Sequence, residues 1–238
     1  MASYQTFARF YDAVQGDRAE HAAYLRGLIE KHQPQSRTVL ELACGTGSIL
    51  KQLQPRYDVT GIDLSEPMLA VAAEKLPGVR LIHGDMTRVA LGESFDVVLC
   101  SYDSINHLLD FGHWEAVFDR AREHVGEEGL FIFDINTEIR LAALAAQPAS
   151  PHWFGDGDLL LLDVRDAGHG VVIWDIRIFE RVEGSTYRLH DEGIAEVSFP
   201  AEQVTASLRN RFSRIRVYDE RRTRPTSRSE RLHFVCAV

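Results

Sequence analysis

The first stretch whose residue types suggest chemistry is a strand-like run that ends in a glycine turn. Residues 41–48 read ELACGTGS, with Gly45 and Gly47 one residue apart. Paired glycines let a backbone approach a ligand closely. A dinucleotide-binding fingerprint needs a third glycine where Leu50 stands, and no Gly-Lys-Ser/Thr of a P-loop follows. Glu41 inside the strand needs hydrogen-bond donors, which favours a cationic or amine-bearing ligand over a pyrophosphate.

Polar residues also end the next three strand-like runs. Asp63 closes the second run, HGDM (83–86) places Asp85 after the third, and CSYDSINHL (100–108) follows the fourth. In open α/β sheets the carboxyl ends of the strands form the ligand crevice. An acidic residue at the position of Asp63 accepts hydrogen bonds from ribose hydroxyls in nucleoside-binding folds of this kind. The four strand ends therefore predict one binding site.

The elements that must position these residues alternate between strand and helix. Short apolar runs predict strands covered on both faces at 38–42, 58–63, 79–83, 95–101 and 129–136. Helices are predicted at 17–32, 48–54, 66–76 and 111–125. Ser65 is the expected N-cap of the third of these helices, with Pro67 in its first turn. Repeated strand–helix units with short connections indicate a doubly wound α/β sheet.

The pattern changes after Trp153. Three alternating stretches, separated by the turns AGHG (167–170) and EGS (183–185), predict an antiparallel β insertion. A helix at 200–209 and strands at 212–219 and 231–238 are expected to follow. We therefore predict an α/β domain formed by residues 1–150 and 199–238, and an antiparallel β insertion at residues 151–198.

Length, charge and cysteine usage narrow the function class. A chain of 238 residues suits one large domain or one domain with an insertion. The net charge of −9 argues against binding to nucleic acid or to anionic membranes. Neither a secretory signal nor a membrane span is expected. Cys44, Cys100 and Cys236 are expected to be buried free thiols of a cytoplasmic protein, and the sequence shows no metal-ligand spacing.

Taken together, the motifs resemble those of the class I S-adenosylmethionine-dependent methyltransferases. The matching segments are ExACGTGS, GIDLSEPML (61–69), GDM (84–86) and YDSINHL (102–108). The resemblance implies a Rossmann-like sheet of seven strands, with the last strand antiparallel. FDINT (133–137) and IFERVEGSTYRLHDE (178–192) are similar to small bacterial methyltransferases with a β-rich insertion before the sixth strand. IAEVSFP (194–200) departs from their pattern, so the resemblance does not identify the acceptor.

This resemblance implies S-adenosyl-L-methionine as the cofactor and S-adenosyl-L-homocysteine as the product. Glu41 would anchor the glycine turn or the cofactor's amino group, and Asp63 would bind the ribose. Asp85 would accept a hydrogen bond from the adenine amino group. An N-terminal helix carrying Tyr11 would cover the cofactor as a lid. The complete predicted cofactor set is Tyr11, Glu41, Ala43, Gly45, Gly47, Asp63, Leu64, Met68, Asp85, Met86, Ser101 and Tyr102.

Candidates for catalysis and for acceptor binding follow the fourth and fifth strands. His107 is a candidate general base, since an imidazole titrates near neutral pH, and Tyr11 is a second candidate for a catalytic role. The predicted acceptor pocket comprises His107, Asn136 and Trp153, with Asp134 and His152 as further candidates. Eight arginines from Arg211 to Arg231 indicate either a solvated strand and loop or a site for a phosphate or carboxylate group on the acceptor.

The function predicted from these residues is methyl transfer to a nitrogen, carboxyl or hydroxyl group of a small molecule. The absence of a compelling base favours an amine or carboxylate acceptor over an alcohol. Two alternatives stay open: a nucleotide-sugar oxidoreductase or epimerase, and a non-catalytic subunit that binds S-adenosylmethionine as a sensor or scaffold. The insertion either walls the acceptor pocket or pairs its edge strands between the subunits of a homodimer.

Overall fold

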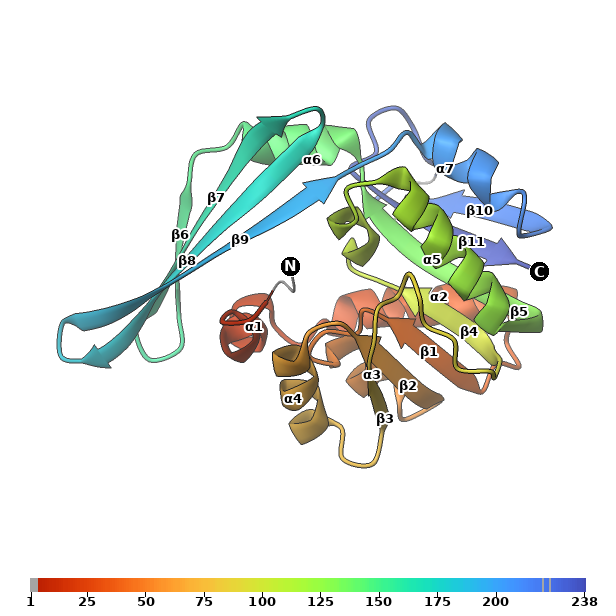
Figure 1. The fold of residues 1–238 in the computed structure, drawn as a ribbon, viewed down its shortest axis with the longest axis horizontal. Coiled ribbons are helices and arrows are strands. Elements are labelled where there is room, and N and C mark those ends of the chain that lie inside the picture. Colours follow the sequence, from red (N-terminus) through yellow and green to blue (C-terminus); the bar gives the residue numbers. More distant parts are fainter. Residues whose placement is uncertain (1–3, 220, 223) are drawn as a thin grey trace.

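The structure, a computed structural model, describes residues 4–219, 221–222 and 224–238. Its larger sheet has seven strands in the order β10-β11-β5-β4-β1-β2-β3 (Figure 1). Only β11 runs against the other strands, as it pairs antiparallel with both β5 and β10. The strands are β1 (Thr38–Leu42), β2 (Asp58–Asp63), β3 (Arg80–His83), β4 (Phe95–Cys100), β5 (Val125–Asn136), β10 (Arg214–Tyr218) and β11 (Arg231–Ala237). The predicted fold class is therefore confirmed.

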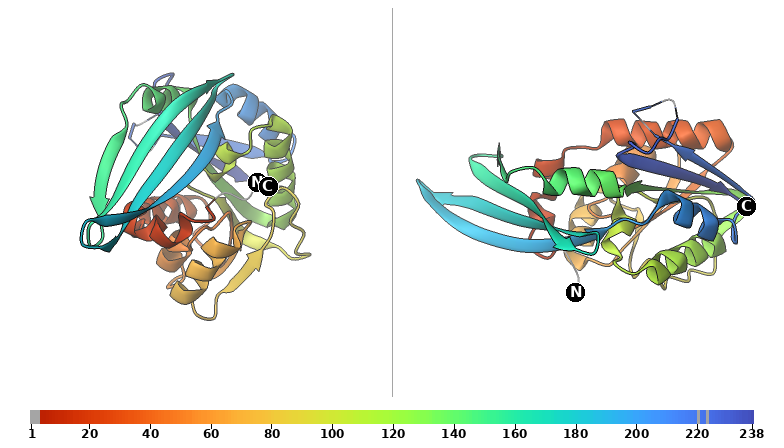
Figure 2. Two further views of the ribbon diagram at one scale, coloured as in Figure 1. Left: turned by 60° about the vertical axis from the view of Figure 1, so that its left-hand side comes forward. Right: turned by 90° about the horizontal axis from the view of Figure 1, so that it is seen from above.

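Helices cover both faces of this sheet because its central strands are apolar on both sides. Along β4, Val98 and Cys100 face the helices α5 (Phe111–His124) and α7 (Ala201–Leu208). Val97 and Leu99 face the opposite side, where α2 (Ala19–His32) and α3 (Ser48–Leu53) pack. The two layers can be followed in the right-hand view of Figure 2. The alternation of side chains along the strands thus produces two separate apolar cores.

Short signals in the sequence determine where the helix before the third strand begins. The Ser65 side chain accepts a hydrogen bond from the backbone N–H of Met68, and Pro67 lies in the first turn of α4 (Glu66–Lys75). Both features agree with the expected N-cap. The helix therefore begins directly after the tip of β2, which brings its first turn to the edge where the polar strand ends meet.

A second, antiparallel sheet has four strands: β6 (Ser150–Phe154), β7 (Asp158–Gly168), β8 (Val171–Glu183) and β9 (Thr186–Val197). It projects from one side of the seven-stranded sheet, and α1 (Ala8–Gln15) lies beneath it (Figures 1 and 2). Phe7 and Phe10 of the N-terminal segment pack against Leu160, Ile176 and Ile194 of this sheet. A segment from the start of the chain therefore covers apolar side chains that lie more than 140 residues further along it.

The predicted elements differ from the observed ones where local signals are weak. The insertion has four strands instead of three, because the exposed strand β6 shows little hydrophobic alternation. A further helix, α6 (Glu138–Ala145), was not predicted, and neither was the short 3-10 helix η1 (Ser104–His107). β5 begins at Val125 rather than at residue 129, so the GEEG segment lies within the strand. The division into two domains stays a prediction, as does the homodimer.

Two predictions from composition can be compared with the structure. Cys44, Cys100 and Cys236 are buried and form no disulfide, as expected. Within the described ranges, no helix combines the length and the apolar character needed to cross a membrane.

Gly61 on β2 is a position at which packing should limit the sequence. An added Cβ would lie 2.7 Å from both Cys44 Sγ and Leu50 Cδ1, which are buried. We expect Gly61→Ala to lower the free energy of unfolding by about 1–3 kcal/mol through overpacking, measured by urea denaturation. The control is Gly27→Ala on the exposed face of α2, where nothing lies within 4 Å of the new Cβ. It should stabilise the protein by up to about 1 kcal/mol, and equal losses in both variants would contradict the packing argument.

Candidate functional site

A pocket of about 350 Å³ lies at the carboxyl ends of β1, β2 and β4. It brings together every residue of the predicted cofactor set except Gly47: Tyr11, Glu41, Ala43, Gly45, Asp63, Leu64, Met68, Asp85, Met86, Ser101 and Tyr102. Residues of the lining that sequence reasoning missed include Tyr4 and Arg18. Neither has a motif that would have identified it.

The glycine turn forms the floor of this pocket. Ala43, Gly45 and Gly47 all have positive φ angles of +56°, +54° and +73°. The Gly45 N–H donates to Asp63 Oδ2 over 2.7 Å, which ties the turn to the tip of β2. A Cβ on Gly47 would lie 2.5 Å from Leu76 Cδ1. Gly47 therefore shapes the turn through its backbone and its packing on α4, without lining the pocket.

Glu41 is a buried carboxylate with one unused acceptor. Ser101 Oγ donates to its Oε1 over 2.6 Å, and Oε2 has no hydrogen-bond partner in the part of the chain that the structure describes. Burial raises the pKa of Glu41 to about 8, and the nearby charge of Asp63 adds to the effect. A buried acceptor that lines a pocket without a partner suits a ligand that brings N–H donors or positive charge.

Asp63 and Asp85 keep acceptor capacity toward the pocket. The carboxylate of Asp63 accepts from the backbone amides of Gly45 and Ser65, one at each oxygen. Each oxygen therefore retains a lone pair for a ligand hydroxyl. Burial raises the pKa of Asp63 above its usual range, partly offset by these backbone bonds. Asp85 Oδ1 accepts hydrogen bonds from the backbone amide and the hydroxyl of Thr87. Its Oδ2 lies 3.9 Å from Arg88 Nε and can accept a hydrogen bond from a ligand in the pocket.

The N-terminal segment, Phe7 and helix α1, is bonded both to the glycine turn and to the second sheet. Asp12 accepts hydrogen bonds from Thr46 Oγ1 and Ser48 Oγ of the glycine turn, at 2.6 and 3.0 Å, and pairs with Lys75 at 2.6 Å. On the other side, the backbone amide of Phe7 donates to a Glu192 oxygen of β9 over 3.1 Å. The segment thus joins the pocket floor to the second sheet, as the predicted lid would require.

A larger cavity of about 1050 Å³ adjoins this pocket. The two spaces share one wall, which consists of Tyr4, Tyr11, Arg18, Tyr102 and His107. The opposite side of the cavity is formed by the second sheet, through side chains that include Leu160, Trp174 and Glu196. A molecule in the cavity is therefore separated from the smaller pocket only by this shared wall.

Two carboxyl groups lie at the wall of the cavity. Asn136 Nδ2 donates to Asp103 Oδ2 over 2.7 Å and to Glu196 Oε2 over 3.3 Å. Burial, and next the charge of Asp103, raise the pKa of Glu196 well above its usual range. Glu196 was not predicted as a site residue, although its place in the strand IAEVSF, between apolar neighbours, is the signal that could have identified it.

The predicted base His107 lies at the shared wall. Its Nε2 shares a hydrogen bond of 3.2 Å with the Tyr4 hydroxyl. Burial lowers the pKa of His107 below its usual value, against the opposing effect of Asp103. The imidazole is therefore neutral near pH 7 and able to accept a proton. Burial also raises the pKa of Tyr11 to about 12, so this residue is a neutral phenol and not a base.

The remaining acceptor predictions divide into two groups. Asn136 lines the cavity as predicted, whereas Trp153 does not. Trp153 lies on β6 with 63% of its surface exposed, while the preceding His152 is part of the cavity lining. The prediction for Trp153 is therefore corrected, because successive side chains of a strand point to opposite faces.

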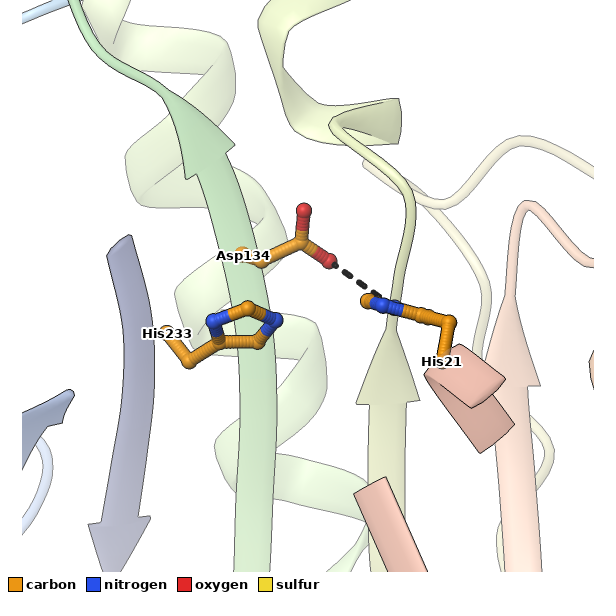
Figure 3. Close-up of side chains that lie close together, drawn as sticks. All are labelled: His21, Asp134 and His233. Carbon is orange, nitrogen blue, oxygen red and sulfur yellow. Dashed lines mark ion pairs between the residues drawn. The ribbon is translucent and has the colours of Figure 1, made fainter. Parts of the chain in front are cut away.

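Three residues close together in space were not linked by the sequence spacing. The ligand atoms of His21, Asp134 and His233 lie within 4.8 Å of one another, so among the described residues they form a group that could hold a metal ion (Figure 3). Asp134, however, already pairs with the Arg231 guanidinium and accepts from the amides of Tyr102 and Asp103. A guanidinium beside the carboxylate repels a second cation. Asp134 is therefore engaged by Arg231 and is not available to a metal ion.

Comparison with known proteins shows where this arrangement recurs. Residues 39–129 match the family described as methyltransferase domain. The putative methyltransferase YqeM of Bacillus subtilis is 32% identical over 97% of this chain and 95% of its own length. The dTDP-3-amino-3,6-dideoxy-alpha-D-glucopyranose N,N-dimethyltransferase of Streptomyces fradiae is 37% identical, but the match spans only 53% of this chain and 52% of that protein.

The fold as a whole also recurs in a solved structure. The crystal structure of an S-adenosylmethionine-dependent methyltransferase from Clostridium acetobutylicum superposes with a TM-score of 0.84. The superposition covers 99% of this chain and 98% of that one, at 23% sequence identity. The second sheet therefore belongs to an arrangement that occurs in another protein.

The pKa of Glu41 predicts how stability depends on pH in the ligand-free protein. The folded state holds this proton with a pKa of about 8, against 4.5 for an ordinary glutamate. The stabilising contribution is therefore fully present below about pH 4.5 and is lost as pH rises through about 8. We expect urea denaturation to show a smaller free energy of unfolding at pH 8 than at pH 6. Glu41→Gln should reduce this difference.

The control for this prediction is Glu202→Gln, which changes an exposed glutamate on α7. It should keep the wild-type dependence on pH. A Glu41→Gln variant with an unchanged dependence would show that another group is responsible.

Proposed function

Because the chain belongs to the class I S-adenosylmethionine-dependent methyltransferases, we propose that it methylates the nitrogen of a small-molecule amine bound in the larger cavity. Membership in this family removes the oxidoreductase alternative and makes the protein a methyltransferase that uses S-adenosylmethionine. The observation that carries the proposal is the shared wall, which sets the cofactor pocket beside a cavity lined by the carboxyl groups of Asp103 and Glu196.

The residues of the smaller pocket fit this cofactor. Glu41 Oε2 would accept from the ammonium of the methionine part, as it has no other hydrogen-bond partner among the described residues. Asp63 would accept from the ribose hydroxyls with the lone pairs that its backbone partners leave open. Leu64 and Met68 would contact the adenine, whose amino group would donate to Asp85. These assignments place the methionine end nearest Tyr11 and Tyr102.

The bound cofactor supplies an electrophilic methyl group on a sulfonium. The protein's part is to align the acceptor and to exclude water. Alignment alone can contribute up to about 7–11 kcal/mol in well-oriented model reactions. The N-terminal segment that joins the glycine turn to β9 contributes Tyr4 and Tyr11 to the shared wall, where it would help to exclude water.

The carboxyl groups of the cavity favour an amine. An N–H of the acceptor would donate to Glu196 or Asp103, which leaves the nitrogen lone pair free to point at the shared wall. A carboxylate acceptor has no N–H to donate to these groups. The name of the Streptomyces fradiae relative, an N,N-dimethyltransferase of an amino sugar, supports the choice of nitrogen.

His107 is suited to handle the proton. Only a neutral amine has the lone pair that attacks the methyl group. The product of the attack is an ammonium ion, which must lose a proton to become a neutral amine again. The neutral imidazole at the shared wall can accept that proton, while its hydrogen bond to Tyr4 holds the ring in place. We assign the role of general base to His107 and a shaping role to Tyr11.

Asp63 provides a direct test of the cofactor assignment. We expect Asp63→Asn to weaken the binding of S-adenosylhomocysteine about tenfold or more, since one charge-assisted hydrogen bond contributes about 1.5–3 kcal/mol. The measurement is isothermal titration calorimetry. The control is Asp58→Asn at the exposed, opposite end of β2, which should bind like the wild type. Unchanged affinity in Asp63→Asn would refute the ribose assignment.

The acceptor proposal predicts which compounds are methylated. A screen with radiolabelled S-adenosylmethionine should show transfer to primary or secondary amines from a metabolite extract, and none to carboxylic acids or alcohols. With an identified amine, Glu196→Ala should raise KM up to about tenfold, because the hydrogen-bond acceptor for the amine is lost, and change kcat less. The control is Asp191→Ala, an exposed position on the same strand. Transfer only to acids or alcohols would overturn the proposal.

A further inference from the structure

A third pocket, of about 300 Å³, adjoins the larger cavity. Arg140, Arg221 and Arg231 line both spaces, so a molecule in the cavity lies next to this pocket. The rest of its lining consists of Asp219, Arg222, Arg228 and Glu230. Arginine side chains therefore dominate the described lining of this pocket, which comes from residues between β10 and β11, from Arg231 and from Arg140 of α6.

Positive charge is in excess among the described lining residues. The Arg231 charge is already balanced, because its guanidinium pairs with Asp103 and Asp134. The four other arginines face only two carboxylates, Asp219 and Glu230. The chain as a whole carries a net charge of −9, so this excess is a local property of the pocket.

The existing ion pairs leave most of the arginine donors available. Arg140 Nη1 and Arg221 Nη1 both lie 3.2 Å from the same oxygen, Glu230 Oε2. Arg222 approaches Asp219 at 3.4 Å through its Nε. A guanidinium has five N–H groups, and each of these contacts uses one of them. The side chains thus have donors left in a fork geometry that matches a phosphate.

We propose that this pocket binds a phosphate-class anion carried by the amine acceptor. The inference rests on the proposed function, since it describes the far end of the same substrate. The amine would lie at the shared wall near His107 and Glu196, and the anionic group would lie beyond Arg231. A dianion would compensate the two uncompensated charges of the described lining, whereas a carboxylate would compensate only one.

Inorganic pyrophosphate and phosphate are suitable probes because they need no knowledge of the acceptor. Calorimetry is done on protein saturated with S-adenosylhomocysteine, at an ionic strength held constant with sodium chloride. We expect saturable binding that is strongest for pyrophosphate, weaker for phosphate and weakest for acetate. Absence of saturable pyrophosphate binding would overturn the proposal. If acetate bound as tightly as phosphate, the pocket would be a carboxylate site, and the proposal of a phosphate-class anion would also be overturned.

Variants locate the binding. Arg140→Gln and Arg221→Gln should each weaken pyrophosphate binding about tenfold, because each removes one charge-assisted hydrogen bond. Arg221→Lys keeps the positive charge and should retain part of the affinity. Arg56→Gln is the matched control. Arg56 is an exposed arginine that does not line the pocket, and its Nη1 lies 2.7 Å from Glu30 Oε1. An equal loss in Arg56→Gln would show a general charge effect and would refute the site.

The outcome is separable from that of the proposed function. None of these arginines lines the cofactor pocket, so each variant should bind S-adenosylhomocysteine as tightly as the wild type, which also reports correct folding. Cofactor binding and amine methylation without pyrophosphate binding would refute only the anion pocket. Pyrophosphate binding without transfer to any amine would refute the proposed acceptor class.

Discussion

The pairing of Arg231 with two carboxylates is the interaction on which the functional edge of the sheet depends. Asp134 at the end of β5 is fully buried, and Asp103 follows β4. The guanidinium of Arg231, at the start of β11, donates to both of them and to Asn136 Oδ1. Without this cation the two charges would be buried unpaired, which is strongly destabilising. The start of β11 is thereby tied to the loop that carries Tyr102.

The same interaction determines the geometry of the wall between the two main spaces. Asp134 also accepts from the backbone amides of Tyr102 and Asp103, which both have positive φ angles of +62° and +52°. Such backbone conformations persist only where surrounding contacts compensate them. The guanidinium of Arg18 lies over the Tyr102 ring, 3.6 Å from its centroid. The wall therefore combines the N-terminal segment with the loop after β4, which Arg231 of β11 supports through Asp103 and Asp134.

Much of the fold and of the cofactor pocket could be predicted because those features are encoded locally. β1 and β2 have the bounds expected from their apolar runs, and the acidic ends Asp63 and Asp85 reach the same pocket through the parallel arrangement of the strands. The lining of the larger cavity was predicted less completely. His152 and Trp153 were both candidates, and His152 alone of the two lines the cavity, because an isolated, exposed strand does not show which of its faces turns inward. Glu196 was missed because a single carboxylate in an apolar strand has no motif.

The sequence by itself determined the class of fold, the cofactor and the residues of the glycine turn, since each depends on neighbours within a few positions or on the regular ends of parallel strands. Only the tertiary structure decided which other residues meet His107 at the larger cavity. Tyr4, Glu196 and Arg231 come from three distant parts of the chain, and no pattern of spacing connects them. Burial, together with the charge of Asp103, raises the pKa of Glu196. The residues before β11 place their arginines next to the cavity. Charge and burial of this kind arise from packing between remote segments, so they exist only once the chain has folded.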